Sequence, residues 1–102
     1  MADNNDYVIA QEIYERYKDM YGSNTQGLCA YIAKDIINAI GGIPTAGYIT
    51  WFGGSCRREH WWVEKNGLII DPMGDDRLGN EVGYRHEKVH QDLGVFMQML
   101  NK

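Results

Sequence analysis

The sequence predicts a small α+β domain in which N-terminal helices pack on an antiparallel sheet. Two segments with helical periodicity come first, and strand-like segments joined by a tight turn follow them. The chain has 102 residues, which is enough for one domain over residues 1–102 and too few for two. We therefore expect every candidate functional residue to belong to one core.

Two helices are predicted in the first half of the chain. Apolar residues recur at helical spacing over residues 7–20, with charged residues mostly between them. A second apolar stripe covers residues 27–40 and ends at Gly41 and Gly42, which are typical of a helix C-terminus. Cys29 therefore falls in the first turn of the second helix, at one end of the stripe that packs on the core.

Strands are predicted in the middle of the chain. Residues 46–52 are rich in β-branched and aromatic side chains. Residues 58–64 and 68–71 have the pattern of two further strands, joined at Asn66 and Gly67. This dipeptide is the strongest short signal of a two-residue hairpin turn.

The last third of the chain predicts turns followed by a helix. Residues 72–83 are mostly turn-forming, and residues 85–100 have helical spacing that Gly94 interrupts. On such a helix His86 and His90 stand four residues apart on one face, a spacing that suits a metal ion. A zinc site there needs further ligands, such as Cys56 or Asp92, so we favour a solvated helix face.

Hairpin geometry brings a histidine and an aspartate together. With Asn66 and Gly67 as the turn, alternation puts His60, Trp62 and Asp71 on one face of the two strands. His60 and Asp71 are then diagonal neighbours, about 7 Å apart between backbone positions and closer between side-chain tips. A four-residue loop places them directly opposite, whereas a three-residue loop separates them.

These side chains suit an activated thiol. A carboxylate that accepts a hydrogen bond from one imidazole nitrogen orients the ring and favours its protonated form. The other nitrogen then serves a nucleophile, and a thiol in the first turn of a helix has a lowered pKa. We therefore predict a triad of Cys29 as nucleophile, His60 as base and Asp71 as the group that orients the base.

The segments QGLCAYIAKDI and HWWVEKNGLIIDP resemble the papain-like cysteine hydrolase superfamily, and most closely its transglutaminase-like branch. In that branch a cysteine begins a helix, a histidine opens a strand in an H-x-W-V-E context, and an aspartate ends the next strand, often before proline. A more distant resemblance is to bacterial double-glycine leader peptidases. The resemblance covers residues 26–72, about half of the chain.

The resemblance implies a minimal papain-like or transglutaminase-like core that transfers acyl groups through a thioester on Cys29. It makes Gln26 a candidate oxyanion-hole donor, although the glutamine of papain-like proteases stands further upstream of the cysteine. Helix capping by Gln26, with the backbone N–H of Cys29 as the oxyanion donor, is the alternative. Trp62 shares the predicted face of His60 and is expected to wall the site.

We expect a cysteine-dependent acyl hydrolase, a thiol protease or amidase that cleaves an amide bond of a peptide or protein substrate and needs no cofactor or metal. Water as the acyl acceptor gives a peptidase, amidase or deamidase, and an amine gives a transglutaminase; the residues leave this choice open. The main alternative is a non-catalytic protein-binding module on the same fold, with a buried and inert Cys29. A third is a metal-binding module that uses His86 and His90.

Charge and hydropathy limit the partners and the location that the sequence predicts. The formal net charge of −4 argues against a basic face for nucleic acid. No apolar run approaches the length of a membrane span, and the N-terminus lacks the order of a signal peptide. We expect the protein to be cytoplasmic where it is made, with delivery elsewhere as an effector left open. The oligomeric state is not set by these patterns.

Overall fold

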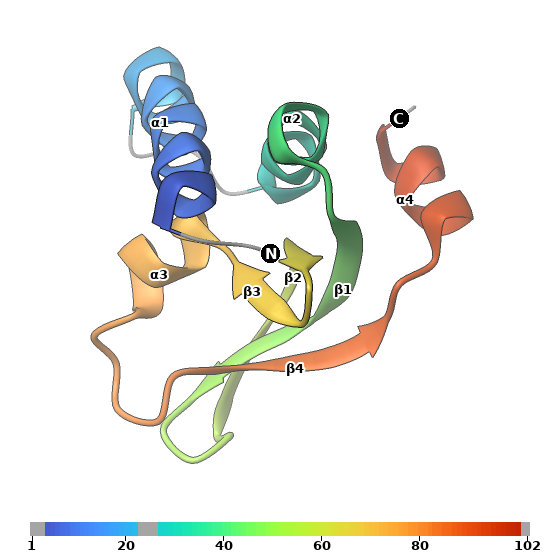
Figure 1. Ribbon diagram of the computed structural model, residues 1–102. Helices are drawn as coiled ribbons and strands as arrows, with labels where there is room; N and C mark the ends of the chain where they lie inside the picture. The colour runs from blue at the N-terminus through green and yellow to red at the C-terminus, as the bar shows by residue number, and fades with distance from the viewer. Residues whose placement is uncertain (1–3, 23–26, 101–102) are drawn as a thin grey trace.

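The computed structural model describes residues 4–22 and 27–100, which form a small α+β fold with helices packed on an antiparallel sheet (Figure 1). This fold class is the predicted one. The strands of the four-stranded sheet lie in the order β3-β2-β1-β4, and each neighbouring pair is antiparallel. In chain order the elements are α1 (Asn4–Tyr21), α2 (Cys29–Ile40), β1 (Ile43–Trp51), β2 (Cys56–Lys65), β3 (Leu68–Ile70), α3 (Pro72–Leu78), β4 (Arg85–His90) and α4 (Leu93–Leu100).

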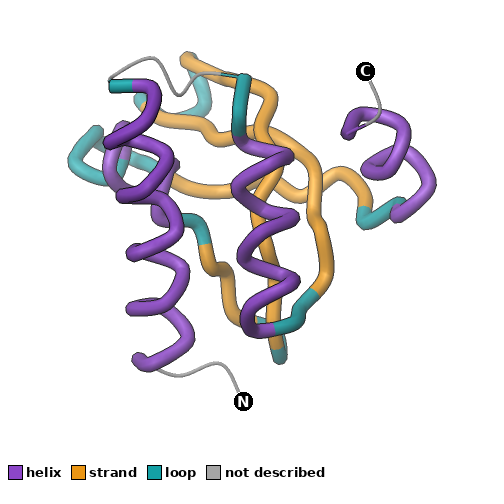
Figure 2. Tube along the Cα trace, turned by 90° about the horizontal axis from the view of Figure 1, so that it is seen from above, coloured by secondary structure: helices purple, strands orange, loops and turns teal. Residues whose placement is uncertain are grey.

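The first five elements follow the sequence predictions, with ends that differ by a few residues. α1 and α2 correspond to the two predicted helices, and β1, β2 and β3 correspond to the predicted strands. Figure 2 shows α1 and α2 lying side by side, and α2 packs against β1 and β2. Within the described ranges, no helix combines the length and the apolarity needed to cross a membrane.

The prediction of turns over residues 72–83 is wrong, because helix α3 occupies Pro72–Leu78. Asp71 stands at its N-cap position and accepts a hydrogen bond from the backbone N–H of Gly74 at 3.1 Å. Proline directly after the cap has the φ angle that a first helical residue needs. Residues with turn chemistry therefore begin a helix here.

The prediction of one helix over residues 85–100 is also wrong. Arg85–His90 is strand β4, and only Leu93–Leu100 is helical. β4 pairs with β1 along its length. This ladder of backbone hydrogen bonds outweighs the helical spacing of the side chains, since local propensity is a weak preference that tertiary pairing overrides.

The hairpin between β2 and β3 turns at Asn66 and Gly67, whose φ angles are 54° and 79°. Both angles lie in the left-handed region that a two-residue turn of this kind requires. The turn sets the predicted register, in which Glu64 pairs with Ile69. β3 is short and pairs only with residues 63–65, so the preceding part of β2 has no strand partner on its outer edge among the described residues.

The register also defines two faces of the sheet, because directly opposed residues of an antiparallel pair point to the same side. We call one side the helix face, which carries Ala46, Trp61, Val63 and Ile70. We call the other side the histidine face, which carries Gly47, His60, Trp62 and His86. The two faces therefore separate apolar side chains from most of the chemistry-bearing ones.

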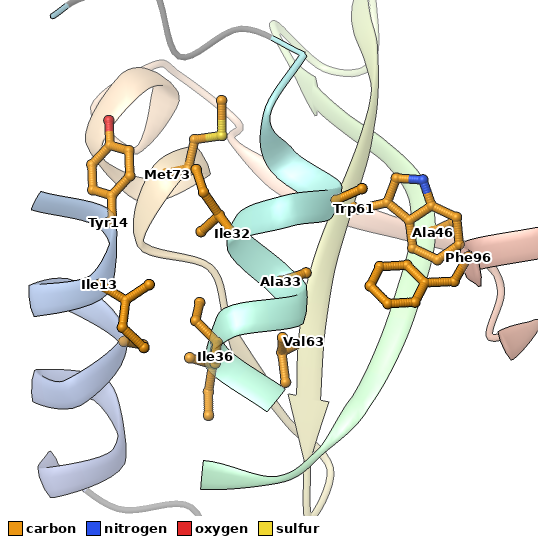
Figure 3. Close-up of a cluster of buried hydrophobic side chains, with 13 residues drawn as sticks. Ile13, Tyr14, Ile32, Ala33, Ile36, Ala46, Trp61, Val63, Met73 and Phe96 are labelled. Carbon is orange, nitrogen blue, oxygen red and sulfur yellow. The ribbon is translucent and has the colours of Figure 1, made fainter. Parts of the chain in front are cut away.

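The hydrophobic core lies on the helix face, where α2 presents Ala33 and Ile36 to Val63 (Figure 3). Trp61 of the same face meets Phe96 of α4, with ring centroids 4.9 Å apart. Burial of these side chains supplies the main driving force for folding. It also fixes α2 against β2, which determines where the first turn of α2 lies.

Candidate active site

Cys29 is the first residue of α2 and lies beside the outer edge of β2. Its side chain forms hydrogen bonds with the His60 side chain and with the backbone of Trp61. This backbone is available because β3 pairs only with residues 63–65 and stops short of it. Cys29 is half-buried and lines two open hollows. A reagent or substrate therefore has a route to the thiol.

His60 contacts both Cys29 and Asp71. Its Nε2 lies 2.9 Å from each carboxylate oxygen of Asp71. A second side-chain hydrogen bond joins His60 to Cys29, and Nδ1 is the ring nitrogen left to make it. The hairpin register predicted that His60 and Asp71 share a face, and the structure places their side chains in contact. The ring is only 5% exposed, so water competes little for these bonds.

Asp71 accepts hydrogen bonds on both of its carboxylate oxygens. Besides the His60 ring, the backbone N–H of Gly74 donates to Oδ1 at 3.1 Å. Nε2 of His86 donates to Oδ2 at 2.7 Å. The Asp71 side chain is 4% exposed, and a charge buried this deeply is costly unless it has such partners.

Burial and contacts act in opposite directions on the pKa values of the triad. Burial favours neutral Asp71, but the charge and hydrogen bond of His60 and then of His86 lower its pKa to about 2. Burial also favours neutral His60, but Asp71 and the hydrogen bond with Cys29 raise its pKa to about 10. Burial raises the pKa of the Cys29 thiol, and His60 more than reverses this, so the net pKa lies below the ordinary value. These directions favour a thiolate beside an imidazolium.

Trp62 packs against His60, as a residue of the same face. The two rings are stacked with centroids 6.2 Å apart, and the indole N–H donates to Glu64 at 3.4 Å. Trp62 is only 1% exposed, so it supports the imidazole from behind and does not line the hollows. The second predicted residue of this group, Gln26, lies outside the described residues.

The metal-site alternative at His86 and His90 fails on the geometry of β4. Residues 86–90 have the letters H-E-x-x-H, a pattern that places two zinc ligands on one face of a helix. Here the segment is a strand, and its register against β1 shifts by one residue between Ala46 and Gly47. This shift turns His90 to the helix face, edge-on to Trp61 at 5.6 Å, while His86 stays on the histidine face. Among the described residues, no three His, Cys, Asp or Glu side chains are grouped to hold a metal ion.

His86 is the residue of this site that the sequence did not predict. Its position depends on the pairing of β4 with β1, and the local signal in residues 85–90 indicated a helix. Alternation in that segment would have placed His86 and Lys88 on one face, but nothing local shows which strand they face. The contact with Asp71 is a product of the whole sheet.

Two hollows flank the contact between Cys29 and His60. One has a volume of about 210 Å³ and is lined further by Ile49, Arg58, Met73, Arg77 and Leu78. The other has a volume of about 330 Å³ and is lined further by Ala46, Gly47, Tyr48, Val89 and Val95. Both also touch Gly27 and Glu59. A molecule can therefore extend to both sides of the thiol.

Comparison of the chain with models of protein families, with curated proteins and with solved structures finds no match. The geometry of the site is therefore the basis for its chemistry. A partly accessible thiol, an imidazole and a buried carboxylate follow one another through hydrogen bonds. This order of groups can generate a nucleophile and then protonate a leaving group.

Proposed function

We propose that this protein is a cysteine-dependent acyl hydrolase that acts on an amide bond through a thioester. The observation that carries the proposal is the continuous hydrogen-bonded order Cys29, His60, Asp71, with the thiol open to two hollows. Its resemblance to the transglutaminase-like branch of the papain-like hydrolases agrees in the order and the roles of these residues. The same arrangement supports the expected papain-like core.

The chemistry follows from the positions of the groups. The Cys29 thiolate attacks the carbonyl carbon, and the His60 imidazolium then gives its proton to the departing amine as the C–N bond breaks. Water, deprotonated by His60, attacks the thioester, releases the acid and leaves the thiolate and the imidazolium. The backbone N–H of Cys29 belongs to the first turn of α2, where amides have no partner within the helix, so it can donate to the oxyanion.

The two hollows favour an acyl donor with groups on both sides of the reacting carbonyl. Cys29, Glu59 and His60 border both of them. An amide within a peptide, or an isopeptide amide of a protein, has such groups, whereas a primary amide, that of a glutamine side chain included, fills one side only. We therefore propose a peptide or protein as the substrate.

The test is the pH dependence of iodoacetamide alkylation, followed by mass spectrometry at Cys29 and Cys56 separately. Both residues are free thiols and half-buried, so Cys56 serves as the internal reference. We expect Cys29 to react with an apparent pKa well below the free-thiol value of about 8.5, and His60→Ala to raise it. We expect the profile of Cys56 to be the same in both proteins.

An unreactive Cys29 in the folded protein, alkylated only in urea, would exclude the hydrolase. The same fold would then serve as a protein-binding module, and a search for partners would replace a search for substrates. A Cys29 that is reactive but insensitive to His60→Ala would exclude the proposed base.

A further inference from the structure

A second histidine binds the carboxylate of the triad. His86 comes from β4, at the far edge of the sheet from β3. Its Nε2 lies 2.7 Å from Oδ2 of Asp71, and its side chain is 7% exposed. The ring is held between Trp62, with centroids 4.8 Å apart, and Tyr84, with centroids 5.3 Å apart. Its position is therefore fixed by packing as well as by the hydrogen bond.

The two imidazoles have different relations to the reacting sulfur. His60 contacts both oxygens of Asp71 and forms a hydrogen bond with Cys29. Of the two Asp71 oxygens, His86 forms a hydrogen bond with Oδ2. The Gly74 backbone N–H donates to Oδ1 on the other side. Donors at both ends prevent the carboxylate from rotating about its Cβ–Cγ bond, so the direction in which it receives the His60 N–H is fixed.

The His86 ring is in turn part of a larger network. The hydroxyl of Tyr84 lies 3.3 Å from its Nε2 and donates to Oδ1 of Asp75 at 3.0 Å. The hydroxyl of Tyr7, from α1, donates to the other oxygen of Asp75. Burial, followed by the charges of Asp71 and Asp75, raises the pKa of Tyr84, so this hydroxyl keeps its proton. The network ties α1, α3 and β4 to the carboxylate of the triad.

The titratable groups around Asp71 come from several elements. They are Cys29 of α2, His60 of β2, Asp75 of α3, His86 of β4, Tyr84 of the preceding loop and Tyr7 of α1. Of these, the two histidines donate directly to the carboxylate.

We infer that His86 is a positioning residue of the proposed centre. His86 acts on Cys29 only through Asp71 and His60. Its Nε2–H holds the Asp71 carboxylate in the orientation that directs the His60 ring to the thiol. This inference rests on the proposed function and adds a fourth residue to it. Loss of the donor leaves Oδ2 with only the His60 N–H that it shares with Oδ1. In a dry site the carboxylate then turns away from the alignment that stabilises the thiolate.

The experiment compares the pH profile of Cys29 alkylation in three variants. Urea unfolding measures the folded fraction of each variant. His86→Phe keeps an aromatic ring between Trp62 and Tyr84 but removes the donor. His86→Gln keeps an N–H that can reach the carboxylate. Tyr17→Phe is the control, because it removes a part-buried hydrogen bond to Asp35, between α1 and α2, and leaves the network intact.

We expect His86→Phe to raise the apparent pKa of Cys29 by about one unit, toward the value in His60→Ala. We expect His86→Gln to lie closer to the wild type than to His86→Phe, and Tyr17→Phe to match the wild type. A folded His86→Phe protein with the wild-type profile would overturn the inference. A His86→Gln profile equal to that of His86→Phe would also overturn it, because the retained donor would then have no effect.

If His86→Phe does not fold, a measurement on the wild-type protein tests the inference instead. Long-range ¹⁵N–¹H NMR spectra report which imidazole nitrogen carries a proton. We expect a proton on Nε2 of His86, and an unprotonated Nε2 would overturn the inference. A wild-type Cys29 with an ordinary pKa is a different outcome, since it removes the proposed function itself.

Discussion

The two faces of the sheet are built from the same strands but are filled in opposite ways. On the helix face, Trp61 and Val63 pack against apolar side chains of α2 and α4. On the histidine face, His60 and His86 contact the carboxylate of Asp71, whose side chain is 4% exposed. Water is largely excluded from the centre of both faces. Apolar burial on the helix face stabilises the fold, whereas burial of the Asp71 charge on the histidine face costs free energy. A single strand, β2, therefore anchors the apolar core on one side and holds an ionised centre on the other.

A substitution in the core on the helix face should destabilise the protein most. Ile36 is 2% exposed and packs two turns along α2 from Cys29. We expect Ile36→Ala to lower the free energy of unfolding by about 3 kcal/mol, because it leaves a cavity. Urea unfolding measures this, and Ile43→Ala, at a residue 50% exposed, is the control with a much smaller loss. An altered alkylation pKa of Cys29 in folded Ile36→Ala would contradict the separation of the two faces.

A smaller effect on stability, present near neutral pH and lost in acid, is expected for Asp71→Asn on the histidine face. The pKa of Asp71 in the folded protein is about 2 against an ordinary 3.8. The stability that its charge contributes is therefore present above about pH 4 and is lost as the pH falls toward 2. We expect the loss of unfolding free energy between pH 5 and pH 2 to be smaller in the variant by about 2 kcal/mol. Equal losses in both proteins would show that folding does not lower the pKa of Asp71.

The smallest effect is expected at the turn that assigns side chains to faces. A Cβ at Gly67 meets nothing within 4 Å, but its φ of 79° is strained for any residue with a side chain. We expect Gly67→Ala to cost about 1 kcal/mol in urea unfolding without changing the alkylation profile of Cys29. A changed profile would indicate that the register slips, since a slip by one residue moves His60 and Asp71 to different faces.

Local signals explain what could be predicted from the sequence. The start of α2 at Cys29 and the turn at Asn66 and Gly67 are encoded within a few residues, and together they brought His60 and Asp71 to one face. The helix α3 was missed because its beginning depends on the Asp71 cap, in a stretch that otherwise has turn chemistry.

Long-range pairing explains what could not be predicted. β4 has helical side-chain spacing and becomes a strand only by pairing with β1, more than thirty residues earlier in the chain. The shift of register at Ala46 and Gly47 then decides which histidine faces Asp71. No pattern within residues 85–90 contains that information, so the role inferred for His86 required the structure.

The short β3 has a consequence for how the site assembles during folding. His60 and Asp71 are 11 residues apart in the sequence, and the hairpin that joins them forms from local contacts, which close fast. Cys29 arrives from a separate helix, which docks on β2 only when the apolar core collapses. We therefore expect Cys29 of the nascent chain to have the reactivity of an ordinary thiol. Reactivity at Cys29 would appear last, as a chemical sign that the whole domain is folded.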